Sequence, residues 1–260
     1  IMQKKKGLSG STLKMIALLT MLIDHIGAAV LARLLMVNGL GELDQTNTDA
    51  IMQWLSANGA LYWMYTVMRM IGRVAFPIFC FLLVEGFLHT HDVKKYAMRL
   101  GLFALLSEIP FDLAFSSKIL EFNYQNVFFT LFIGLLTMIA YRAVEEKEEW
   151  NQALKVILYI LIVAAGMALA YFLKTDYAEK GVFCIMVLYI FRKKKMWQII
   201  AGCASFIWET PALFGFIPIA FYNGTRGWKM KYFFYIFYPA HLLILYLLCY
   251  FMGISGYSAV

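Results

Sequence analysis

The chain consists largely of apolar stretches about twenty residues long, which short charged loops separate. Apolar residues make up 62% of its 260 positions, well above the roughly 45–50% that is usual in soluble domains. A helix needs about 20 such residues to cross the hydrocarbon core of a bilayer. The sequence therefore predicts an all-α integral membrane protein, a polytopic bundle of about eight or nine transmembrane helices in a lipid bilayer. We expect one domain over residues 1–260.

The apolar runs also place the spans. We expect them at residues 13–37, 61–88, 96–115, 127–141, 154–173, 181–191 and 232–252, with an interrupted region at 197–222. Within that region Glu209-Thr210-Pro211 leaves two pieces that are each too short for an ordinary span, so we expect a short or re-entrant hairpin. Broken helices at membrane depth occur mainly where they line a cavity inside the protein. The interruption therefore predicts a cavity near Glu209.

The charged loops predict the orientation of the bundle. Loops rich in lysine and arginine alternate with loops that are acidic or sparsely charged, and basic loops tend to face the cytoplasm. We therefore expect a multi-pass protein of the cell (inner or plasma) membrane with a cytoplasmic N-terminus and a long outer loop at 38–59. The basic loops account for the net charge of +7 without nucleic acid. They contain Lys4–Lys6, Lys14, Lys94, Lys95, Arg99, Arg142, Lys147, Lys155 and Arg192–Lys195.

Ionisable residues inside the spans are the main functional signal, because a charge at the bilayer centre is costly. Asp24 and His25 lie in the first span, with His25 roughly 18 Å along the helix axis from Leu13. A histidine there can be satisfied simply by a backbone carbonyl or a neighbouring helix. Its position beside a carboxylate favours a functional role, although neighbours on a helix point about 100° apart and need not touch. Asp24 can instead pair with an arginine.

The second span carries two guanidinium groups on one face, since Arg69 and Arg73 are four residues apart. Such a pair suits a phosphate or a carboxylate of a ligand. Structural pairing with carboxylates of the neighbouring spans would explain it equally well, and we expect one arginine of each kind. Pro77 is expected to kink this helix and open space beside the arginines. Glu85 lies further along the same span.

Two carboxylates, Glu108 and Asp112, lie four residues apart near the outer end of the third span, and Asn126 begins the return helix. Like charges at this spacing repel each other, so we expect a cation beside them. They can form a proton relay, a counter-charge for the arginines or a binding site for an amine. In the last span His241 lies several residues into an apolar run and is a weaker candidate.

Several common types of site are not indicated. Cys80, Cys184, Cys203 and Cys249 all lie inside apolar runs without metal-ligand spacing, so we expect neither a disulfide framework nor a metal site. The sequence also lacks the P-loop, HExxH and GxSxG patterns of common soluble mechanisms.

The polar residues themselves fit two classes of function. A membrane-embedded transferase would use His25 as a general base toward an amine or hydroxyl, with Arg73 and Arg69 stabilising anionic groups of the donor. A proton-coupled transporter or flippase would use the intramembrane carboxylates and histidine as a proton pathway around the interrupted helix. The residues alone leave both classes open.

Five stretches of the sequence carry a family resemblance, and the first half of the chain is the more densely matched. The chain resembles the TraX family at LKMIALLTMLIDHIG (13–27), RMIGRVAFPIFCFLLVEGF (69–87), VKKYAMRLGLFALLSEIPFDLAF (93–115), NVFFTLFIGLL (126–136) and FFYIFYPAHLLIL (233–245). More distantly, it is similar to the integral-membrane acyltransferases related to the type 3 acyltransferases and to the heparan-glucosaminide acetyltransferase.

The resemblance implies an acetyl-CoA-dependent acyltransferase. The protein that gave the family its name N-acetylates the amino terminus of conjugative pilin, and in the broader group an intramembrane histidine of the first helix motif acts in acyl transfer. By resemblance these roles fall on His25 and, for the arginine of the following motif, on Arg73. The resemblance further implies acetyl-CoA approaching from the cytoplasm and a peptide N-terminus, a pilin or a sugar as acceptor.

These observations lead to one expected mechanism. His25, oriented by a carboxylate such as Asp24 or Glu108, takes the proton of the acceptor, and Arg73 stabilises the oxyanion that forms. An acetyl-histidine route is the alternative chemistry, and a non-catalytic membrane assembly factor is a third hypothesis beside the transferase and the transporter. We expect the catalytic residues to be His25, Asp24 and Arg73, and the binding residues to be Arg69, Glu85, Glu108, Asp112, Asn126, Glu209 and His241.

Overall fold

The computed structural model describes residues 6–44, 46–228 and 231–258, so Lys4 and Lys5 of the predicted basic N-terminus lie outside the described residues. Apart from two isolated β-bridges, the regular structure in these ranges is helical, as predicted. The helices are α1 (Gly10–Ile26), the π-helix η1 (Gly27–Leu31), α2 (Ala32–Val37), the 3-10 helix η2 (Leu40–Glu42), α3 (Thr48–Gly72), α4 (Ala75–His89), α5 (Val93–Ser116), α6 (Val127–Glu145), α7 (Gln152–Phe172), α8 (Ala178–Ile190), α9 (Lys195–Ser205), the 3-10 helix η3 (Thr210–Gly215), α10 (Phe216–Ala220) and α11 (Lys231–Phe251).

Apolar helices of membrane-spanning length confirm an all-helical membrane protein. Four stretches of the described chain are long and apolar enough to cross a bilayer: Gly10–Val37, Thr48–His89, Val127–Glu145 and Gln152–Phe172. Each contains or closely matches a predicted span, and α5, α8 and α11 lie at three further predicted positions. The number of eight or nine crossings stays a prediction.

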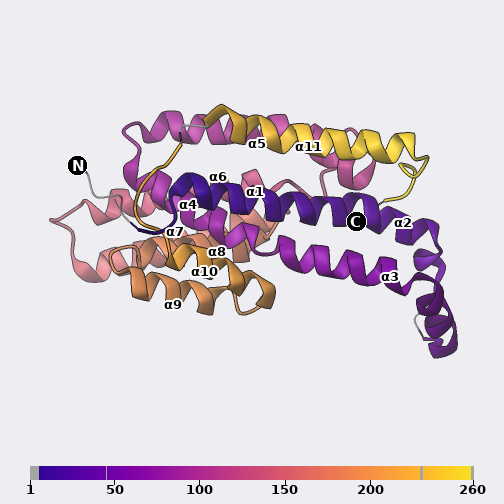
Figure 1. Cartoon of the computed structure of the whole chain (residues 1–260). Helices are drawn as coiled ribbons and strands as arrows, with labels where there is room; N and C mark the ends of the chain where they lie inside the picture. Colours follow the sequence, from indigo (N-terminus) through magenta and orange to yellow (C-terminus); the bar gives the residue numbers. More distant parts are fainter. Residues whose placement is uncertain (1–5, 45, 229–230, 259–260) are drawn as a thin grey trace.

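The helices run side by side in an elongated bundle (Figure 1). In this view α5 and α11 form the upper layer, α1 and α3 cross the middle and α9 lies on the opposite side. One apolar core lies where α4, α6 and α8 meet, around buried residues such as Phe81, Leu135 and Ile185. A second core joins α1, α5 and α11, with Met21, Phe111 and Leu242 among its members. The two cores meet along α1 and α4, which pack against each other.

Polar residues in the loops set where several helices begin. The side chains of Ser9, Asp92, Asn126 and Asn151 each accept a hydrogen bond from a backbone N–H in the first turn of α1, α5, α6 and α7, respectively. Such caps satisfy donors that have no partner within the helix and contribute about 1 kcal/mol each.

The second predicted span is broken, and the break lies at Arg73 and Val74, between α3 and α4. Pro77 has no N–H to donate to the carbonyl four residues earlier, which belongs to Arg73, so the helical hydrogen bonding is interrupted there. Gly215 of η3 packs into the break, where an added Cβ would lie 2.6 Å from Pro77 Cγ. The kink expected from Pro77 therefore takes the form of an interruption at Arg73 itself.

The prediction of a long outer loop at 38–59 is wrong for its second half, residues 48–59, which are helical. Helix α3 already begins at Thr48, where the side chain of Asn47 accepts a hydrogen bond from Ala50 N (3.1 Å). Trp54 lies within this helical extension, and its indole Nε1 donates to the carbonyl of Asn38 at 2.7 Å. Hydropathy placed the boundary at the first long apolar run, whereas capping and the indole contact stabilise three further turns of polar helix.

The interruption predicted at Glu209 is present and forms a hairpin. Helix α9 runs in, and η3 with α10 runs back. The Lys195 ammonium at the start of α9 donates to the carbonyls of Ala220 and Tyr222, both at 2.7 Å, so both ends of the hairpin lie on the same side of the bundle. Leu8 pairs with Tyr222 through an isolated β-bridge, which places the N-terminal segment on that side too.

Candidate functional site

Two neighbouring cavities lie inside the bundle. The small cavity, of about 100 Å³, contains both predicted catalytic side chains of α1, Asp24 and His25. The large cavity, of about 560 Å³, lies toward the N-terminal end of α1. Met21, Phe79 and Val127 line both cavities, so these three side chains form the boundary between them.

The structure places His25 against a second histidine. Nδ1 of His25 lies 2.7 Å from Nε2 of His241 on α11, and the two rings are nearly parallel, with an interplanar angle of 7°. Nδ1 of His241 in turn lies 2.7 Å from the carbonyl oxygen of Phe237. The predicted orienting carboxylate, Asp24 or Glu108, is therefore replaced by His241, which was predicted only as a weaker candidate and a binding residue.

The carbonyl at the end of this chain determines where the protons lie. A carbonyl oxygen only accepts, so Nδ1 of His241 carries a hydrogen and donates it to Phe237. In the neutral ring Nε2 of His241 then accepts, and His25 donates from Nδ1. Nε2 of His25 is left with a lone pair, and no hydrogen bond reaches it from the described residues. His25 lines the small cavity, so this arrangement presents a base to whatever enters there.

Asp24 faces the other way and pairs with an arginine, one of the two options left open by the sequence. Arg69 Nη1 donates to Asp24 Oδ2 at 2.6 Å. Gly72 on α3 allows this approach, since a Cβ at that position would collide with the Asp24 side chain. The π-helix that follows His25 widens the turn of α1 just beyond the site, a departure that is frequent at functional sites.

Arg73, at the break between α3 and α4, lines the small cavity and reaches across to the hairpin. Its Nε lies 3.5 Å from Glu209 Oε1, the carboxylate at the predicted interruption. Arg69 and Arg73 thus both pair with carboxylates, but the ion pair of Arg73 is the longer one. The break between α3 and α4 and the interruption at Glu209 therefore meet beside the small cavity.

Glu108, Asp112 and Asn126 form a separate network that lines neither cavity. The Asn126 amide donates to Glu108 Oε2 and to the carbonyl of Ala104, and Asp112 Oδ2 accepts from Glu121 N at 2.8 Å. None of the described side chains supplies the cation expected beside the two carboxylates, because no ion pair reaches either of them within the described ranges. Their hydrogen bonds instead fix the connection between α5 and α6.

The sequence analysis missed Asp176, Tyr124 and Tyr177, which also line the small cavity. The Tyr124 hydroxyl donates to Asp176 Oδ1 at 2.7 Å. Both belong to loops, at 117–126 and 173–177, that looked like ordinary connections between spans. Burial of Asp176 raises the pKa of its carboxyl above the ordinary value, and the hydrogen bond from Tyr124 and the charge of Arg73 oppose that shift. A loop aspartate beside an aromatic residue was the only signal available.

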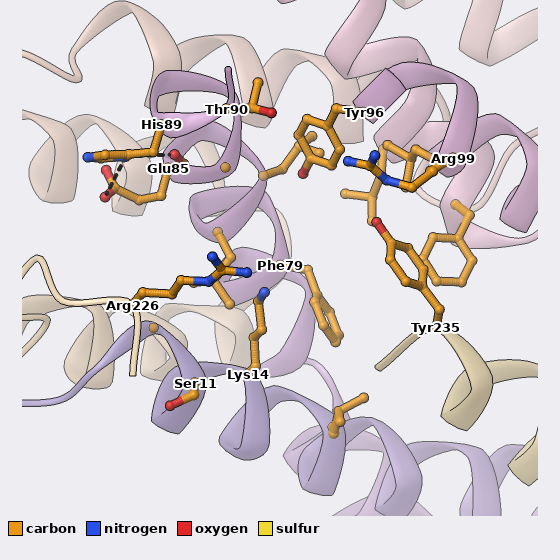
Figure 2. Close-up of a pocket in the computed structure, with 18 of the residues that line it drawn as sticks. Ser11, Lys14, Phe79, Glu85, His89, Thr90, Tyr96, Arg99, Arg226 and Tyr235 are labelled. Carbon is orange, nitrogen blue, oxygen red and sulfur yellow. Dashed lines mark hydrogen bonds and ion pairs between the residues drawn. The ribbon is translucent and has the colours of Figure 1, made fainter. Parts of the chain in front are cut away.

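Figure 2 shows the large cavity, into which Lys14, Arg99 and Arg226 point from α1, α5 and the segment after α10. Glu85 of α4 lies on its wall beside His89, whose Nδ1 is 3.9 Å from Glu85 Oε2. Arg99 Nε is buried and has no hydrogen-bond partner among the described residues. The cavity is therefore cationic, and of the predicted binding residues it contains Glu85.

In the part of the chain that the structure describes, no group of three histidine, cysteine, aspartate or glutamate side chains is arranged to hold a metal ion. The small cavity supplies a base and two guanidinium groups, and the large cavity supplies cations for an anionic ligand.

Comparisons with known proteins agree with the resemblance seen in the sequence. A family model described as TraX protein matches residues 9–249. A similar protein is the probable fimbrial assembly protein FimC, serogroup H1, of Dichelobacter nodosus, which is 27% identical over 208 residues, or 70% of this chain and 83% of that protein. No solved structure gives a significant match.

Proposed function

The chain belongs to the TraX family, and from that membership and the geometry of the histidine pair we propose that it is a membrane-embedded acetyltransferase. It transfers an acetyl group from acetyl-CoA to an amine or hydroxyl of a peptide, pilin or glycan acceptor. The observation that carries this proposal is the hydrogen-bonded pair of His25 and His241, which leaves Nε2 of His25 without a hydrogen-bond partner among the described residues, on a side chain that lines the small cavity. The similar protein's name, which refers to fimbrial assembly, fits a pilin-like acceptor.

His25 acts as the general base. Its Nε2 takes a proton from the acceptor, while the hydrogen bond from Nδ1 to His241 keeps the ring in the productive tautomer and orientation. His241 is a positioning residue, because it acts through His25. A correctly placed base of this kind contributes about 10²- to 10⁴-fold to a rate.

The large cavity is the entry site for the donor. Acetyl-CoA would supply the acetyl group as a thioester, and its phosphates match the cations Lys14, Arg99 and Arg226. The buried Arg99 Nε, which lacks a partner among the described residues, is the polar atom in this cavity most in need of an acceptor. The thioester end then passes Phe79 to reach the small cavity, which borders the same side chain.

Arg73 stabilises the negative charge that develops on the thioester carbonyl oxygen during attack. It lines the small cavity, and while its Nε lies 3.5 Å from Glu209, its guanidinium group has further N–H donors for a second acceptor. Fixed cations in a water-poor site stabilise such a charge more than they would in bulk water. Arg69, held at 2.6 Å by Asp24, has the structural role.

This mechanism requires a defined orientation. We propose that the N-terminus and the mouth of the large cavity face the cytoplasm, where the donor is found, and that the bundle has eight or nine helical crossings of the cell membrane when the two limbs of the hairpin are included. The basic residues at the end of the bundle that holds Lys14 and Arg99 support this orientation.

Release of free CoA from acetyl-CoA tests the proposal directly. The purified chain in nanodiscs is compared with His25→Ala and Arg73→Ala, and with His91→Ala as a control at an exposed position. We expect release by the wild type and the control, and loss of release in folded His25→Ala. A wild type that neither releases CoA nor binds acetyl-CoA would contradict the proposal and favour a transporter, which should then move solute into liposomes without a thioester.

A further inference from the structure

The loop that carries Asp176 is fixed in place by another loop and by α6. Gln125 N donates to the carbonyl of Lys174 at 3.0 Å, and Asp176 N donates to the carbonyl of Gln125 at 2.8 Å. The Thr130 hydroxyl donates to the carbonyl of Asp176. Two hydrogen bonds therefore hold the backbone of Asp176 itself and a third holds Lys174, although Asp176 lies between two helices rather than within one.

The same loop contains residues in an unfavourable backbone conformation. Lys174, Tyr177 and Ala178 have φ values of 52°, 64° and 41°, in the left-handed region that residues with a Cβ rarely adopt. Each such residue costs on the order of 1 kcal/mol or more and persists only where the surroundings impose it. The fold thus accepts backbone strain on both sides of Asp176, and the result is that its carboxylate lines the small cavity.

The charges around the small cavity do not balance. Asp24 pairs with Arg69, and Glu209 pairs with Arg73. Asp176 forms no ion pair within 4.0 Å among the described residues, and its hydrogen-bond donor, the Tyr124 hydroxyl, is neutral. With Glu209, which lies beside the small cavity rather than on its wall, two guanidinium groups therefore face three carboxylates, which leaves one negative charge in excess. A carboxylate without an ion-pair partner of its own is costly when it is buried, and a cationic ligand would remove that cost.

We propose that Asp176, positioned by Tyr124, binds the ammonium form of a primary amine in the small cavity. This inference rests on the proposed function and narrows it: the acceptor is a cationic amine rather than a hydroxyl. A cavity of about 100 Å³ holds little more than the reacting groups, so an amine on Asp176 lies within reach of His25 and Arg73, which line the same space.

The chemistry follows from this placement. The ammonium bound to Asp176 gives one proton to Nε2 of His25 and becomes a neutral amine. The amine attacks the thioester carbonyl carbon, the carbon–nitrogen bond forms and the carbon–sulfur bond breaks. The nitrogen loses a second proton, which the leaving thiolate takes up as a thiol. His25 then releases its proton to solvent, so the sum is one amide, one thiol and one proton.

The test compares an amine with a neutral compound of the same shape. Binding of propylamine and of 1-propanol is measured by calorimetry on the full chain in nanodiscs, with and without acetyl-CoA. We expect wild type to prefer the amine, and Asp176→Asn to lose about tenfold or more of its affinity for the amine but not for the alcohol, because a hydrogen bond to a charged group is removed. Tyr124→Phe should lose only a few-fold, and Asp44→Asn, in a loop outside both cavities, should change nothing.

Hydrolysis of acetyl-CoA without an acceptor separates this inference from the proposed function. Wild type is expected to hydrolyse acetyl-CoA slowly, and Asp176→Asn is expected to bind acetyl-CoA like wild type, because Asp176 does not line the large cavity; this binding also shows that the variant is folded. A wild type without preference for the amine, or an Asp176→Asn variant that keeps it, would overturn the inference. If wild type does not hydrolyse or transfer at all, the proposed function fails, whereas the binding comparison still decides whether Asp176 recognises an amine.

Discussion

The two cavities differ in how their charged groups are satisfied. In the small cavity the guanidinium groups are held by carboxylates at 2.6 and 3.5 Å, and His25 is held by His241 at 2.7 Å. In the large cavity the cations of three separate segments converge, and a nitrogen of Arg99 has no partner among the described residues. Fixed groups suit a reaction, since they need no rearrangement as charge develops. Converging cations suit capture of an anionic ligand from solvent.

Replacement of His25, the proposed base, should have the largest effect, and this effect should be on the rate of transfer rather than on donor affinity. In His25→Ala we expect transfer to fall by about 10²- to 10⁴-fold, while affinity for acetyl-CoA changes by a few-fold at most, since His25 does not line the large cavity. Rates come from CoA release and affinities from calorimetry. An equal loss of both would show that the two cavities do not divide chemistry from donor binding.

Removal of the positioning residue should have a smaller effect of the same kind. In His241→Phe the ring of His25 loses its acceptor at Nε2 of His241, and we expect kcat to fall about tenfold or more with the KM of the donor unchanged. His241→Gln keeps an acceptor in place and should recover part of kcat. If Gln and Phe gave the same kcat, His241 would be a packing residue only.

A substitution in the large cavity should instead weaken donor binding and leave the rate of transfer unchanged. In Arg99→Gln we expect the KM of acetyl-CoA to rise about tenfold, as for loss of one charge-assisted hydrogen bond, with kcat unchanged. The dependence of KM on ionic strength should also weaken, because a cation has been removed. Lys94→Gln, at an exposed position next to α5's start, is the matched control. A fall in kcat without a change in KM would contradict the assignment of Arg99 to donor binding in the large cavity.

The smallest effect concerns the loop 117–126, which carries Tyr124. The Lys118 ammonium and the amide groups of Asn123 lower the pKa of Glu121 to about 2. A carboxyl with a lowered pKa in the folded state stabilises the protein above its ordinary pKa of 4.5 and loses that contribution as pH falls toward 2. We therefore expect Glu121→Gln to unfold at a slightly lower temperature than wild type at pH 6, with the difference vanishing near pH 2. A difference that is the same at both pH values would contradict the role of this charge.

Sequence reasoning was sufficient for the parts of the site that are local. Asp24, His25, Arg69 and Arg73 stand out because charges inside apolar runs need a reason, and all four line the small cavity. The break at Glu209 followed from the length of the apolar pieces on either side of it. Apolar runs likewise placed the helices to within a few residues, apart from the start of α3.

The long-range contacts could not be obtained in the same way. His25 and His241 are 216 residues apart, and nothing in either segment indicates that they meet. Arg33, which no pattern singled out, is fully buried and donates to the carbonyls of Ala29 and Ala114 and to Ser117 Oγ. Asp176 belongs to a loop that looked like an ordinary connection between spans, whereas hydrogen bonds from a neighbouring loop hold it beside the small cavity.

Because His241 lies on α11, the pair of His25 and His241 forms only after the other charged residues of the small cavity have been synthesised. A chain emerging from the ribosome inserts its first helices long before α11, so His25, Arg69 and Arg73 are in the membrane while Nδ1 of His25 still lacks its acceptor. The bridge between Leu8 and Tyr222 closes at a similarly late stage. In the proposed mechanism, a nascent chain that stalls before α11 would hold every charge of the small cavity but no oriented base.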